Sequence, residues 1–304
     1  MREFNETNLT EAVADRFDGI RDDRLREVMG SLVRHLHDFV REVDLTEDEW
    51  AAAIQFLTAT GQISDDSRQE FILLSDVLGV SALVDTINHR VPAGATQSTV
   101  VGPFYVQDAP YLENGHDMTV GVDIPGEHTW VEGRVLALDG APIADATVDV
   151  WQTRPDSLYD VQDEDSEMQM RGRFRTDGDG RFWYRTYKPV SYPVPGDGPV
   201  GQILRAVGGH GMRPAHIHAA VSAPGYQRVV THIFPDGDEY LDSDTVFAVK
   251  ESLIVDFRTV DSAEEASRLG MPCPFLRVDF DFRLVPESPE AVPVVGTAEA
   301  AQRA

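Results

Sequence analysis

The stretch GRFRTDGDGRFWYRT, residues 172–186, contains two short runs of alternating side chains on either side of a Gly- and Asp-rich segment. Side chains of a β-strand point alternately to its two faces, so period-two runs that include aromatic residues indicate half-buried strands. Gly178 and Gly180 can adopt a positive φ without steric penalty, which favours a tight turn between the runs. We therefore predict a β-hairpin here.

The sequence on both sides of this hairpin continues the same pattern. Five further short runs are rich in Val, Thr and aromatic residues and are separated by Gly, Pro and Asp; they cover residues 129–138, 146–153, 215–221, 227–234 and 276–284. Many short strands with turn signals between them are typical of a β-sandwich. The last segment, residues 286–304, has little to bury and is predicted to be a loose tail.

The N-terminal third has a helical pattern instead. In DDRLREVMGSLVRHLHDFVREV, residues 22–43, apolar residues recur at three-and-four spacing, which is typical of an amphipathic helix. Thr46 and Glu49 have the spacing of a capping box and predict the start of a second helix, and a third is predicted over about residues 67–90. The predicted fold class is α+β, with a helical region, a β-sandwich domain and a tail over residues 1–98, 99–285 and 286–304.

Composition excludes several classes of protein. The 304 residues include one cysteine, Cys273, which excludes a disulfide framework and suits a reducing cytoplasm. The N-terminus lacks the apolar core of a signal peptide, and no run of about eighteen apolar residues occurs, so we expect a cytoplasmic protein without a membrane span. The net charge of −26 repels a phosphate backbone, so nucleic acid is not an expected partner.

The segment RPAHIHAAV, residues 213–221, is the clearest candidate for a chemical site. Residues two apart on a strand share a face, so His216 and His218 project together. Two adjacent imidazoles can form half of a metal site, although alternation on a partly buried strand can also place two structural histidines there. No H-E-x-x-H motif and no third clustered histidine accompany the pair, which disfavours the common zinc enzymes.

Two tyrosines in polar loops are further candidate ligands. Tyr159 lies in RPDSLYD and Tyr192 in PVSYPVPGDG, each after a predicted strand. Taken singly, either tyrosine is more often a packed aromatic residue with a hydrogen-bonded hydroxyl than a metal ligand. The residues alone therefore leave the ligand set open.

Three segments together resemble the intradiol ring-cleavage dioxygenases. They are DVWQTRPDSLYD, RGRFRTDGDGRFWYRTYKPVSYPVPGDGP and GGHGMRPAHIHAAVSAPGY, in the order and spacing of that family, and the similarity runs from the helical region to about residue 285. In the family, a tyrosine from each of the first two segments and both histidines of the third bind a non-haem ferric ion. The resemblance implies an enzyme with Fe(3+) held by Tyr159, Tyr192, His216 and His218.

These ligand types suit ferric iron, because two phenolates are hard anionic oxygens that stabilise Fe(III) over Fe(II). The resemblance implies that Tyr192 leaves the iron and accepts a proton when a diol binds, whereas Tyr159 stays. Arg213 matches the family arginine that stabilises negative charge developing on the ring, although a structural salt bridge would explain it equally well. With O₂ as the second substrate, the product is a muconate-type diacid.

The substrate is narrowed by departures from the catechol-cleaving branch. Fourteen residues after His218, where that branch has a glutamine near the iron, this chain has His232, and WQTR replaces a Trp-His-Ala-Asn pattern. Residues 231–257 are more similar to the branch that acts on hydroxyquinol, benzene-1,2,4-triol. Alignment within the family places six further residues in the pocket wall: Leu73, Asp76, Val100, Pro103, Phe104 and Thr245.

Asp76 carries most of the substrate prediction. A carboxylate that faces an aromatic pocket needs a hydrogen-bond partner, and the third hydroxyl of hydroxyquinol is a suitable one. The alternative is that Asp76 is exposed on its helix. A catechol or chlorocatechol 1,2-dioxygenase with the same chemistry therefore stays open.

The resemblance also implies a homodimer formed through the N-terminal helices, with a phospholipid in the interface of several members. The apolar stripe of residues 20–43 fits this, and it would also serve a core within one chain. A last alternative is a non-enzymatic, transthyretin-like binding module in which the histidine pair is incidental. A ferric tyrosinate enzyme would be burgundy in solution, whereas a binding module would be colourless.

Overall fold

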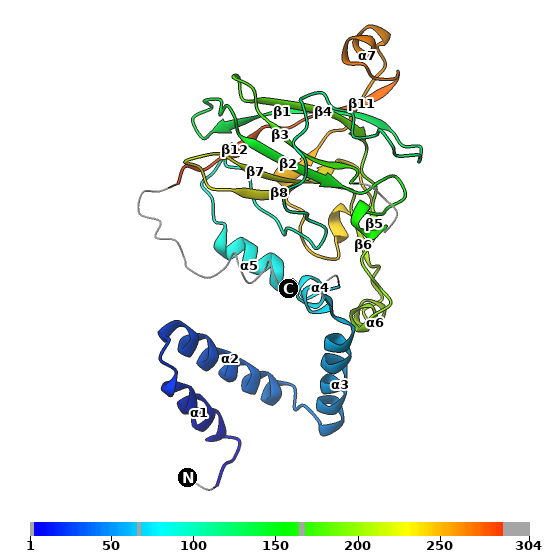
Figure 1. Ribbon diagram of the computed structural model, residues 1–304. Helices are drawn as coiled ribbons and strands as arrows, with labels where there is room; N and C mark the ends of the chain where they lie inside the picture. The colour runs from blue at the N-terminus through cyan, green and yellow to red at the C-terminus, as the bar shows by residue number, and fades with distance from the viewer. Residues whose placement is uncertain (1–2, 66–67, 164–167, 288–304) are drawn as a thin grey trace. The chain divides into compact units, whose positions relative to one another are not determined.

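The computed structural model describes residues 3–65, 68–163 and 168–287 (Figure 1). Packing divides the chain into two compact units, of which the first ends at Gln62 and the second begins at Ile63. The predicted domain division at residue 98, between the helical region and the β-sandwich, stays a prediction. Most of the predicted tail, from residue 288 onward, lies outside the described residues.

The first unit is helical, as its apolar spacing predicts. It contains α1 (Leu9–Ala14), the 3-10 helix η1 (Asp15–Gly19), α2 (Asp23–Glu42) and almost all of α3 (Glu47–Ile63). The Thr46 hydroxyl accepts a hydrogen bond from the Glu49 backbone nitrogen at 3.3 Å, and the Glu49 carboxylate accepts one from the Thr46 nitrogen at 2.9 Å. The predicted capping box is therefore confirmed. Across the described ranges, no helix has both the length and the apolar character needed to cross a membrane.

The predicted third helix is in fact two helices. α4 (Glu70–Val77) and α5 (Val80–Asn88) are separated at Gly79, which has a left-handed φ of 70°. A residue with that φ cannot continue a right-handed helix, and glycine adopts it without steric cost. The prediction of one helix is wrong because the apolar spacing continues across a position where the backbone does not.

The second unit contains a β-sandwich, which confirms the predicted α+β class (Figure 1). One sheet has the order β10-β11-β1-β12, with β4 also paired to β1. Its strands are β1 (His128–Ala137), β4 (Arg181–Tyr187), β10 (Arg258–Val260), β11 (Phe275–Asp279) and β12 (Phe282–Leu284). The other sheet has the order β3-β2-β7-β8-β9. Its strands are β2 (Thr147–Gln152), β3 (Arg171–Arg175), β7 (Ile217–Ser222), β8 (Val229–Pro235) and β9 (Ile254–Val255).

Short elements connect the strands of this unit. A two-stranded ladder joins β5 (Tyr192–Pro193) to β6 (Met212–Arg213), and it pairs Tyr192 directly with Arg213. The remaining elements are α6 (Pro199–Ala206), α7 (Ala263–Leu269), η2 (Asp160–Gln162), η3 (Leu241–Ser243) and η4 (Glu251–Leu253). The ladder matters for function because it brings a predicted ligand and the predicted charge-stabilising arginine together.

The turn in the opening stretch forms, but it does not make a hairpin. Gly180 has a φ of 73°, and the Asp177 carboxylate accepts hydrogen bonds from the backbone nitrogens of Asp179 and Arg181 at 2.9 and 2.8 Å. However, β3 pairs with β2, and β4 pairs with β1. The turn therefore carries the chain from one sheet to the other, so the hairpin prediction is wrong although its turn residues are correct.

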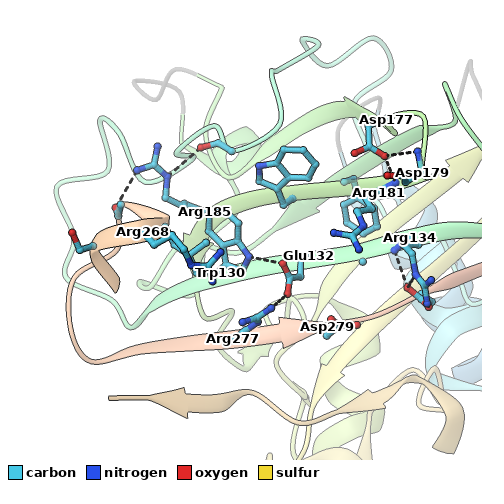
Figure 2. Close-up of a pocket in the computed structure, with 18 residues that line it drawn as sticks. Trp130, Glu132, Arg134, Asp177, Asp179, Arg181, Arg185, Arg268, Arg277 and Asp279 are labelled. Atoms are coloured by element: carbon cyan, nitrogen blue, oxygen red, sulfur yellow. Dashed lines mark hydrogen bonds and ion pairs between the residues drawn. The ribbon is translucent and has the colours of Figure 1, made fainter. Parts of the chain in front are cut away.

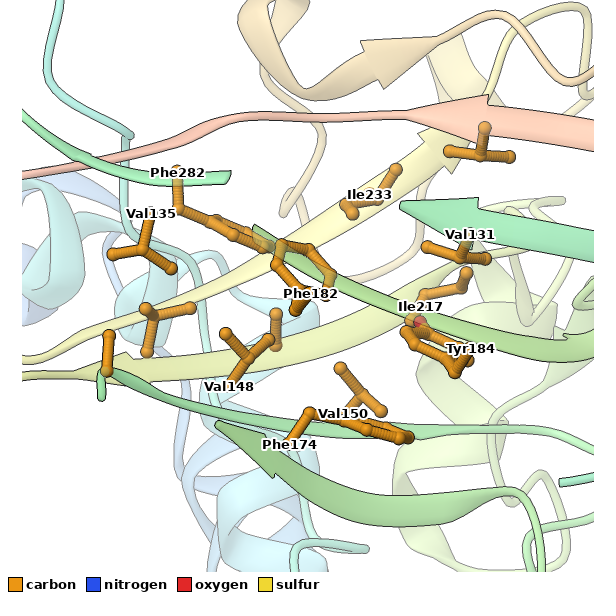
Figure 3. Close-up of a cluster of buried hydrophobic side chains, with 14 of the residues drawn as sticks. Val131, Val135, Val148, Val150, Phe174, Phe182, Tyr184, Ile217, Ile233 and Phe282 are labelled. Carbon is orange, nitrogen blue, oxygen red and sulfur yellow. The ribbon is translucent and has the colours of Figure 1, made fainter. Parts of the chain in front are cut away.

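The hydrophobic core lies between the two sheets (Figure 3). Inward side chains from both sheets are at most 2% exposed; they include Val131, Val135, Val148, Val150, Phe174, Phe182, Tyr184, Ile217 and Ile233. Because neighbours on a strand alternate, the residues next to Val150, Ile217 and Ile233 point to the outer face of the β3-β2-β7-β8-β9 sheet. That outer face carries the two candidate histidines.

Candidate metal centre

Three neighbouring strands place aromatic rings side by side on this outer face. Trp151 of β2 is the cross-strand partner of His218 on β7, and His218 is the partner of His232 on β8. The ring centroids of His216 and His218 are 4.7 Å apart, and those of His218 and His232 are 4.2 Å apart. The expectation that no third histidine joins the pair is therefore wrong, because the next strand supplies one.

The four predicted metal ligands converge on one point. The Nε2 atoms of His216 and His218 are 3.1 Å apart, and the Tyr159 hydroxyl lies 3.3 Å from the first and 3.1 Å from the second. Tyr192 arrives from β5, with its ring centroid 5.5 Å from those of both Tyr159 and His216. Side chains more than 50 residues apart in sequence thus meet around a shared centre.

The histidines of this centre are uncharged. Burial lowers the pKa of His216 and His218 well below the ordinary value, and the charge of Arg213 lowers both further. The Nδ1 of His216 lies 2.7 Å from the Pro214 carbonyl oxygen. Because a carbonyl oxygen only accepts, Nδ1 carries the proton and the Nε2 lone pair faces the centre. Neutral imidazoles in this orientation are suited to bind a metal.

The phenols complete a donor set that fits ferric iron. Burial raises the pKa of Tyr159 well above its ordinary value, and the neighbouring Tyr192 raises it further. A phenol in such a place ionises only when a nearby cation compensates the charge. Two phenol oxygens and two imidazole nitrogens that face one point are hard and intermediate donors, which suits a trivalent iron ion.

Arg213 makes a structural ion pair and also reaches the centre. Its Nε donates to the Asp244 carboxylate at 3.2 Å, and its Nη1 lies 3.2 Å from the Tyr192 hydroxyl. Burial by itself lowers the pKa of Arg213, but Tyr192 and Asp244 outweigh that effect and keep the guanidinium charged. Its buried Nη2 has no hydrogen-bond partner within the described ranges. This Nη2 is a spare donor for a ligand.

A cavity of about 490 Å³ opens beside Tyr192 and Arg213. Five of the predicted pocket residues line it, namely Leu73, Asp76, Val100, Pro103 and Phe104. Thr245 is not among the lining residues in the described part of the chain; its hydroxyl lies 3.1 and 2.9 Å from the carbonyl oxygens of His210 and Met212, to which its single proton can be donated. His232 is likewise not among the lining residues that the structure describes; it is fully buried against the two other histidines.

Asp76 is buried rather than exposed on its helix. It is 9% exposed and lines the cavity from α4. Burial raises the pKa of its carboxyl, while a hydrogen bond from Ser81 and the charge of Arg213 act in the opposite direction. The cavity therefore contains a hydrogen-bonding group whose charge is only partly compensated by protein.

Two charged side chains near Tyr159, Arg171 and Asp160, have no signal in the sequence. Phe104 stacks on the Tyr159 ring with centroids 4.4 Å apart, and Arg171 donates to the Phe104 carbonyl oxygen at 3.0 Å. Arg171 also forms an ion pair with Asp160, and both side chains are at most 4% exposed. Asp244, the partner of Arg213, is one of 52 acidic residues, and nothing in the sequence distinguishes it from the others. Such partners are defined only by proximity in space.

A larger cavity, of about 980 Å³, lies on the outer face of the other sheet (Figure 2). None of the four predicted ligands lines it. Some of its charged side chains pair with one another, as Arg134 does with Asp281 at 2.6 Å and Arg277 does with Glu132. We therefore assign the chemistry to the smaller cavity, which reaches Tyr192.

Comparison with known proteins identifies the family. A family model described as Dioxygenase matches residues 100–286, and one described as Catechol dioxygenase N terminus matches residues 22–96. The chain belongs to the intradiol ring-cleavage dioxygenases. Membership confirms the resemblance read from the three sequence segments and excludes the non-enzymatic alternative. The iron that is general for this family agrees with the donor set of the dioxygenase described here.

Named relatives cover almost all of this intradiol dioxygenase. Hydroxyquinol 1,2-dioxygenase of Rhizobium sp. (strain MTP-10005) is 50% identical over 284 residues, 92% of this chain and 96% of that protein. 6-Chlorohydroxyquinol 1,2-dioxygenase of Cupriavidus pinatubonensis is 50% identical over 288 residues, 94% of this chain and 99% of that protein. The crystal structure of hydroxyquinol 1,2-dioxygenase from Pseudomonas putida DLL-E4 superposes with a TM-score of 0.88 at 47% identity, covering 93% of this chain and 99% of that one.

Proposed function

We propose that this enzyme is a ferric hydroxyquinol 1,2-dioxygenase. It cleaves the bond between the two adjacent hydroxylated carbons of benzene-1,2,4-triol and inserts both atoms of O₂, which gives 3-hydroxy-cis,cis-muconate, a tautomer of maleylacetate. The observation that carries the proposal is the buried Asp76 carboxylate in the cavity that ends at Tyr192 and Arg213. The names of its relatives support the same substrate.

Tyr159, Tyr192, His216 and His218 are the proposed ligands of the ferric ion. When bound, ferric iron lowers the pKa of a chelating diol and draws electron density from its ring, so that the ring reacts with O₂ directly. Tyr192 borders the cavity and, held as a phenolate by the bound ion, would accept a diol proton and become a neutral phenol; Arg213 Nη1 lies 3.2 Å from its oxygen. Tyr159 is fully buried under Phe104 and stays in place.

Arg213 supplies the fixed positive charge for the reacting ring. Its Nη2 is buried and unpaired within the described ranges, and the residue lines the cavity. A preorganised cation stabilises charge that develops during reaction without having to reorient, which makes it more effective than water. The ion pair with Asp244 holds the guanidinium in this position.

Asp76 sets the preference for a third hydroxyl. A buried carboxylate that loses its hydrogen-bond donor is costly, so a substrate that supplies the donor is favoured over one that does not. A site built to bind a substrate hydroxyl can reject the analogue that lacks it by about 10⁴–10⁵ in kcat/KM. His232, beside the histidine pair, is proposed to shape the same site from behind.

The iron site is tested by tyrosine variants with a matched control. Tyr159→Phe and Tyr192→Phe each remove one phenolate ligand and are expected to lose iron or part of the visible charge-transfer band, together with most of the turnover. Tyr184→Phe is the control, because Tyr184 is equally buried in the core and its hydroxyl has no hydrogen-bond partner among the described residues. A colourless wild-type protein that binds no iron would refute the proposal.

The substrate is tested by steady-state kinetics with hydroxyquinol and catechol. Asp76→Val is expected to lower kcat/KM for hydroxyquinol and to leave that for catechol unchanged or improved. Leu73→Val, which changes the same wall without removing an acceptor, should affect both substrates by a similar factor. If the wild-type enzyme cleaves catechol as efficiently as hydroxyquinol, the catechol or chlorocatechol alternative replaces this assignment.

We further propose that the enzyme is a cytoplasmic homodimer that associates through its helical region. The supporting observation is the row of apolar side chains on α2 that are more than 40% exposed: Leu25, Val28, Leu32, Leu36 and Phe39. An apolar surface of this kind is costly in water and favours a partner surface. Phospholipid acyl chains would suit the same surface, and mass spectrometry of an organic extract of the purified dimer tests for them.

A further inference from the structure

The two histidines of the site are held in different ways. The Nδ1–H of His216 donates to the Pro214 carbonyl oxygen at 2.7 Å. The Nδ1 of His218 is buried and has no hydrogen-bond partner within the described ranges. Histidines that bind metals almost always donate their second N–H to an acceptor, which fixes the orientation of the ring. Among the described residues, therefore, packing contacts rather than a hydrogen bond hold the His218 ring at this nitrogen.

The ring of His218 is enclosed by packing instead. The Trp151 indole lies nearly parallel to it, with centroids 4.6 Å apart and an interplanar angle of 10°. On the opposite side, from β8, His232 approaches edge-on at 4.2 Å. These contacts come from the register of β2, β7 and β8, which sets the three residues directly opposite one another. Aromatic rings from both neighbouring strands therefore pack against His218.

Trp151 itself is placed by shape and not by a hydrogen bond. It is 1% exposed, and its Nε1 has no hydrogen-bond partner in the part of the chain that the structure describes. The Tyr105 ring also packs against the indole, with centroids 4.9 Å apart and an interplanar angle of 57°. An indole that buries an unpaired N–H incurs a desolvation penalty that a purely apolar aromatic residue would avoid. The contact of Trp151 with the site is therefore made by the flat face of its ring and not by its N–H.

We propose that Trp151 is a positioning residue for the iron site, whose indole fixes the His218 ring by stacking in place of the missing hydrogen bond. The inference rests on the proposed function, since it concerns a ligand of the proposed iron. Loss of the stack allows the imidazole to rotate about its Cβ–Cγ bond, so Nε2 leaves the direction shared with His216 and Tyr159. The expected consequence is weaker retention of iron, before any effect on turnover is considered.

Two substitutions separate stacking from simple filling of space. Trp151→Phe keeps a flat ring against His218, whereas Trp151→Met fills much of the volume with a flexible chain and removes the stack. The matched control is Phe174→Met, which breaks a comparable stacked pair with Tyr184, at 4.9 Å and 11°, in the core between the sheets. Phe174 is fully buried on β3 of the same sheet, so its loss reports general destabilisation.

The measurement is the rate at which the iron-loaded enzyme loses iron to an excess of a hydroxamate chelator. Decay of the visible band monitors this loss, and circular dichroism verifies that every variant is folded under the same conditions. Loss of an outer partner of a metal ligand typically costs 10–100-fold in metal affinity, so Trp151→Met should release iron about 10–100-fold faster than wild type. Trp151→Phe and Phe174→Met should stay within about threefold of wild type, well short of that range. The electron paramagnetic resonance signal of the ferric ion should broaden in Trp151→Met alone.

Contrary results have separate meanings. If Trp151→Met retains iron like the wild type, or if Phe174→Met releases it equally fast, Trp151 has no positioning role while the proposed function stands. If Trp151→Phe loses iron as fast as Trp151→Met, stacking is not the property that matters and the inference fails. If the wild-type protein holds no iron, the proposed function fails first, and the inference fails with it.

Discussion

At the scale of single residues, Arg213 has two roles, because it forms an ion pair with Asp244 and also contacts Tyr192 in the site. Its Nε is paired with Asp244 and its Nη1 lies 3.2 Å from the Tyr192 hydroxyl, while its buried Nη2 has no hydrogen-bond partner among the described residues. The Asp244 carboxylate is itself held by backbone nitrogens of Val246 and Ala248 at 3.3 and 3.0 Å. A rigidly held carboxylate thus orients the guanidinium in advance. A preoriented cation needs no reorganisation when charge develops on the ring, whereas a mobile one would have to reorient at a cost in free energy.

Substitutions at this ion pair should affect kcat more than binding. Arg213→Ala is expected to lower kcat by about 10²–10³, as for other charge-stabilising groups, with a much smaller effect on the Kd of a substrate analogue. Asp244→Asn keeps the shape but weakens the orientation, so we expect a smaller loss of kcat in the same direction. Asp281→Asn, in an ion pair on the other sheet, is the control. Equal losses in kcat and in analogue affinity would assign Arg213 to binding alone.

A buried carboxylate outside the site predicts a pH-dependent stability. Asp149 is 6% exposed, and burial raises its pKa to about 6, against a hydrogen bond from Tyr105. Because the folded state holds this proton more tightly than the unfolded state, its stabilising contribution is complete below pH ~4 and is lost as the pH rises through about 6. Asp149→Asn should therefore raise the free energy of unfolding by about 1–3 kcal/mol at pH 8 and by much less at pH 4.5. Urea denaturation at both pH values checks this, and an equal gain at both would contradict it.

At the scale of elements, the metal centre is a product of strand register. Trp151, His218 and His232 are opposite one another only because β2, β7 and β8 pair as they do, and a slip of one residue would turn His218 into the core. The register is set by the inward residues, such as Val150, Ile217 and Ile233, which are at most 2% exposed. The site and the core are therefore specified together by the same strands.

A glycine in β1 shows how closely its neighbours approach. A Cβ atom built on Gly133 would lie 1.9 Å from the Phe280 carbonyl oxygen, at the junction of β11 and β12, and only backbone movement relieves such a contact. Gly133→Ala should therefore lower the free energy of unfolding by more than about 3 kcal/mol, at the severe end for single substitutions. Gly178→Ala, where nothing lies within 4 Å, should change it by less than about 1 kcal/mol. Thermal and urea unfolding of both variants compare these values, and similar stabilities would contradict the expectation.

At the scale of the whole molecule, the acidic charge and the apolar helix surface act against each other. A net charge of −26 keeps copies apart in solution, whereas the exposed apolar row on α2 favours association. The proposed dimer through this row would resolve the conflict, because it would bury apolar area and leave the acidic surface in water. Dimerisation should then be strengthened by salt, which screens the charge.

The dimer is tested with two substitutions of equal charge change. Leu36 is 52% exposed in the apolar row, and Leu36→Glu places a charge where the proposed interface would exclude water. Arg24→Gln lowers the net charge by the same one unit at a side chain that is 76% exposed. Light scattering should show a monomer for Leu36→Glu and a dimer for Arg24→Gln. A monomeric wild-type protein, or a dimer in both variants, would exclude this interface.

The sequence by itself determined those features that depend on neighbours along the chain. Apolar spacing located α2, the Thr46–Glu49 spacing located the cap of α3, and alternation placed His216 and His218 on one face. The three linked segments supplied the family and the candidate ligands. Each of these signals depends on a few neighbouring residues, or on the order of several short stretches. It can therefore be recognised without knowledge of the packing.

Only the tertiary structure decided which distant groups meet. Gly79 divides a helix that apolar spacing makes continuous, the turn after β3 leads to the opposite sheet, and His232 joins the histidine pair from the next strand. The burial of Asp76 and the pairing of Arg213 with Asp244 belong to the same group. The physical reason is that strand pairing and burial minimise the free energy of the whole core, and a local pattern contains no information about which surfaces that core brings together.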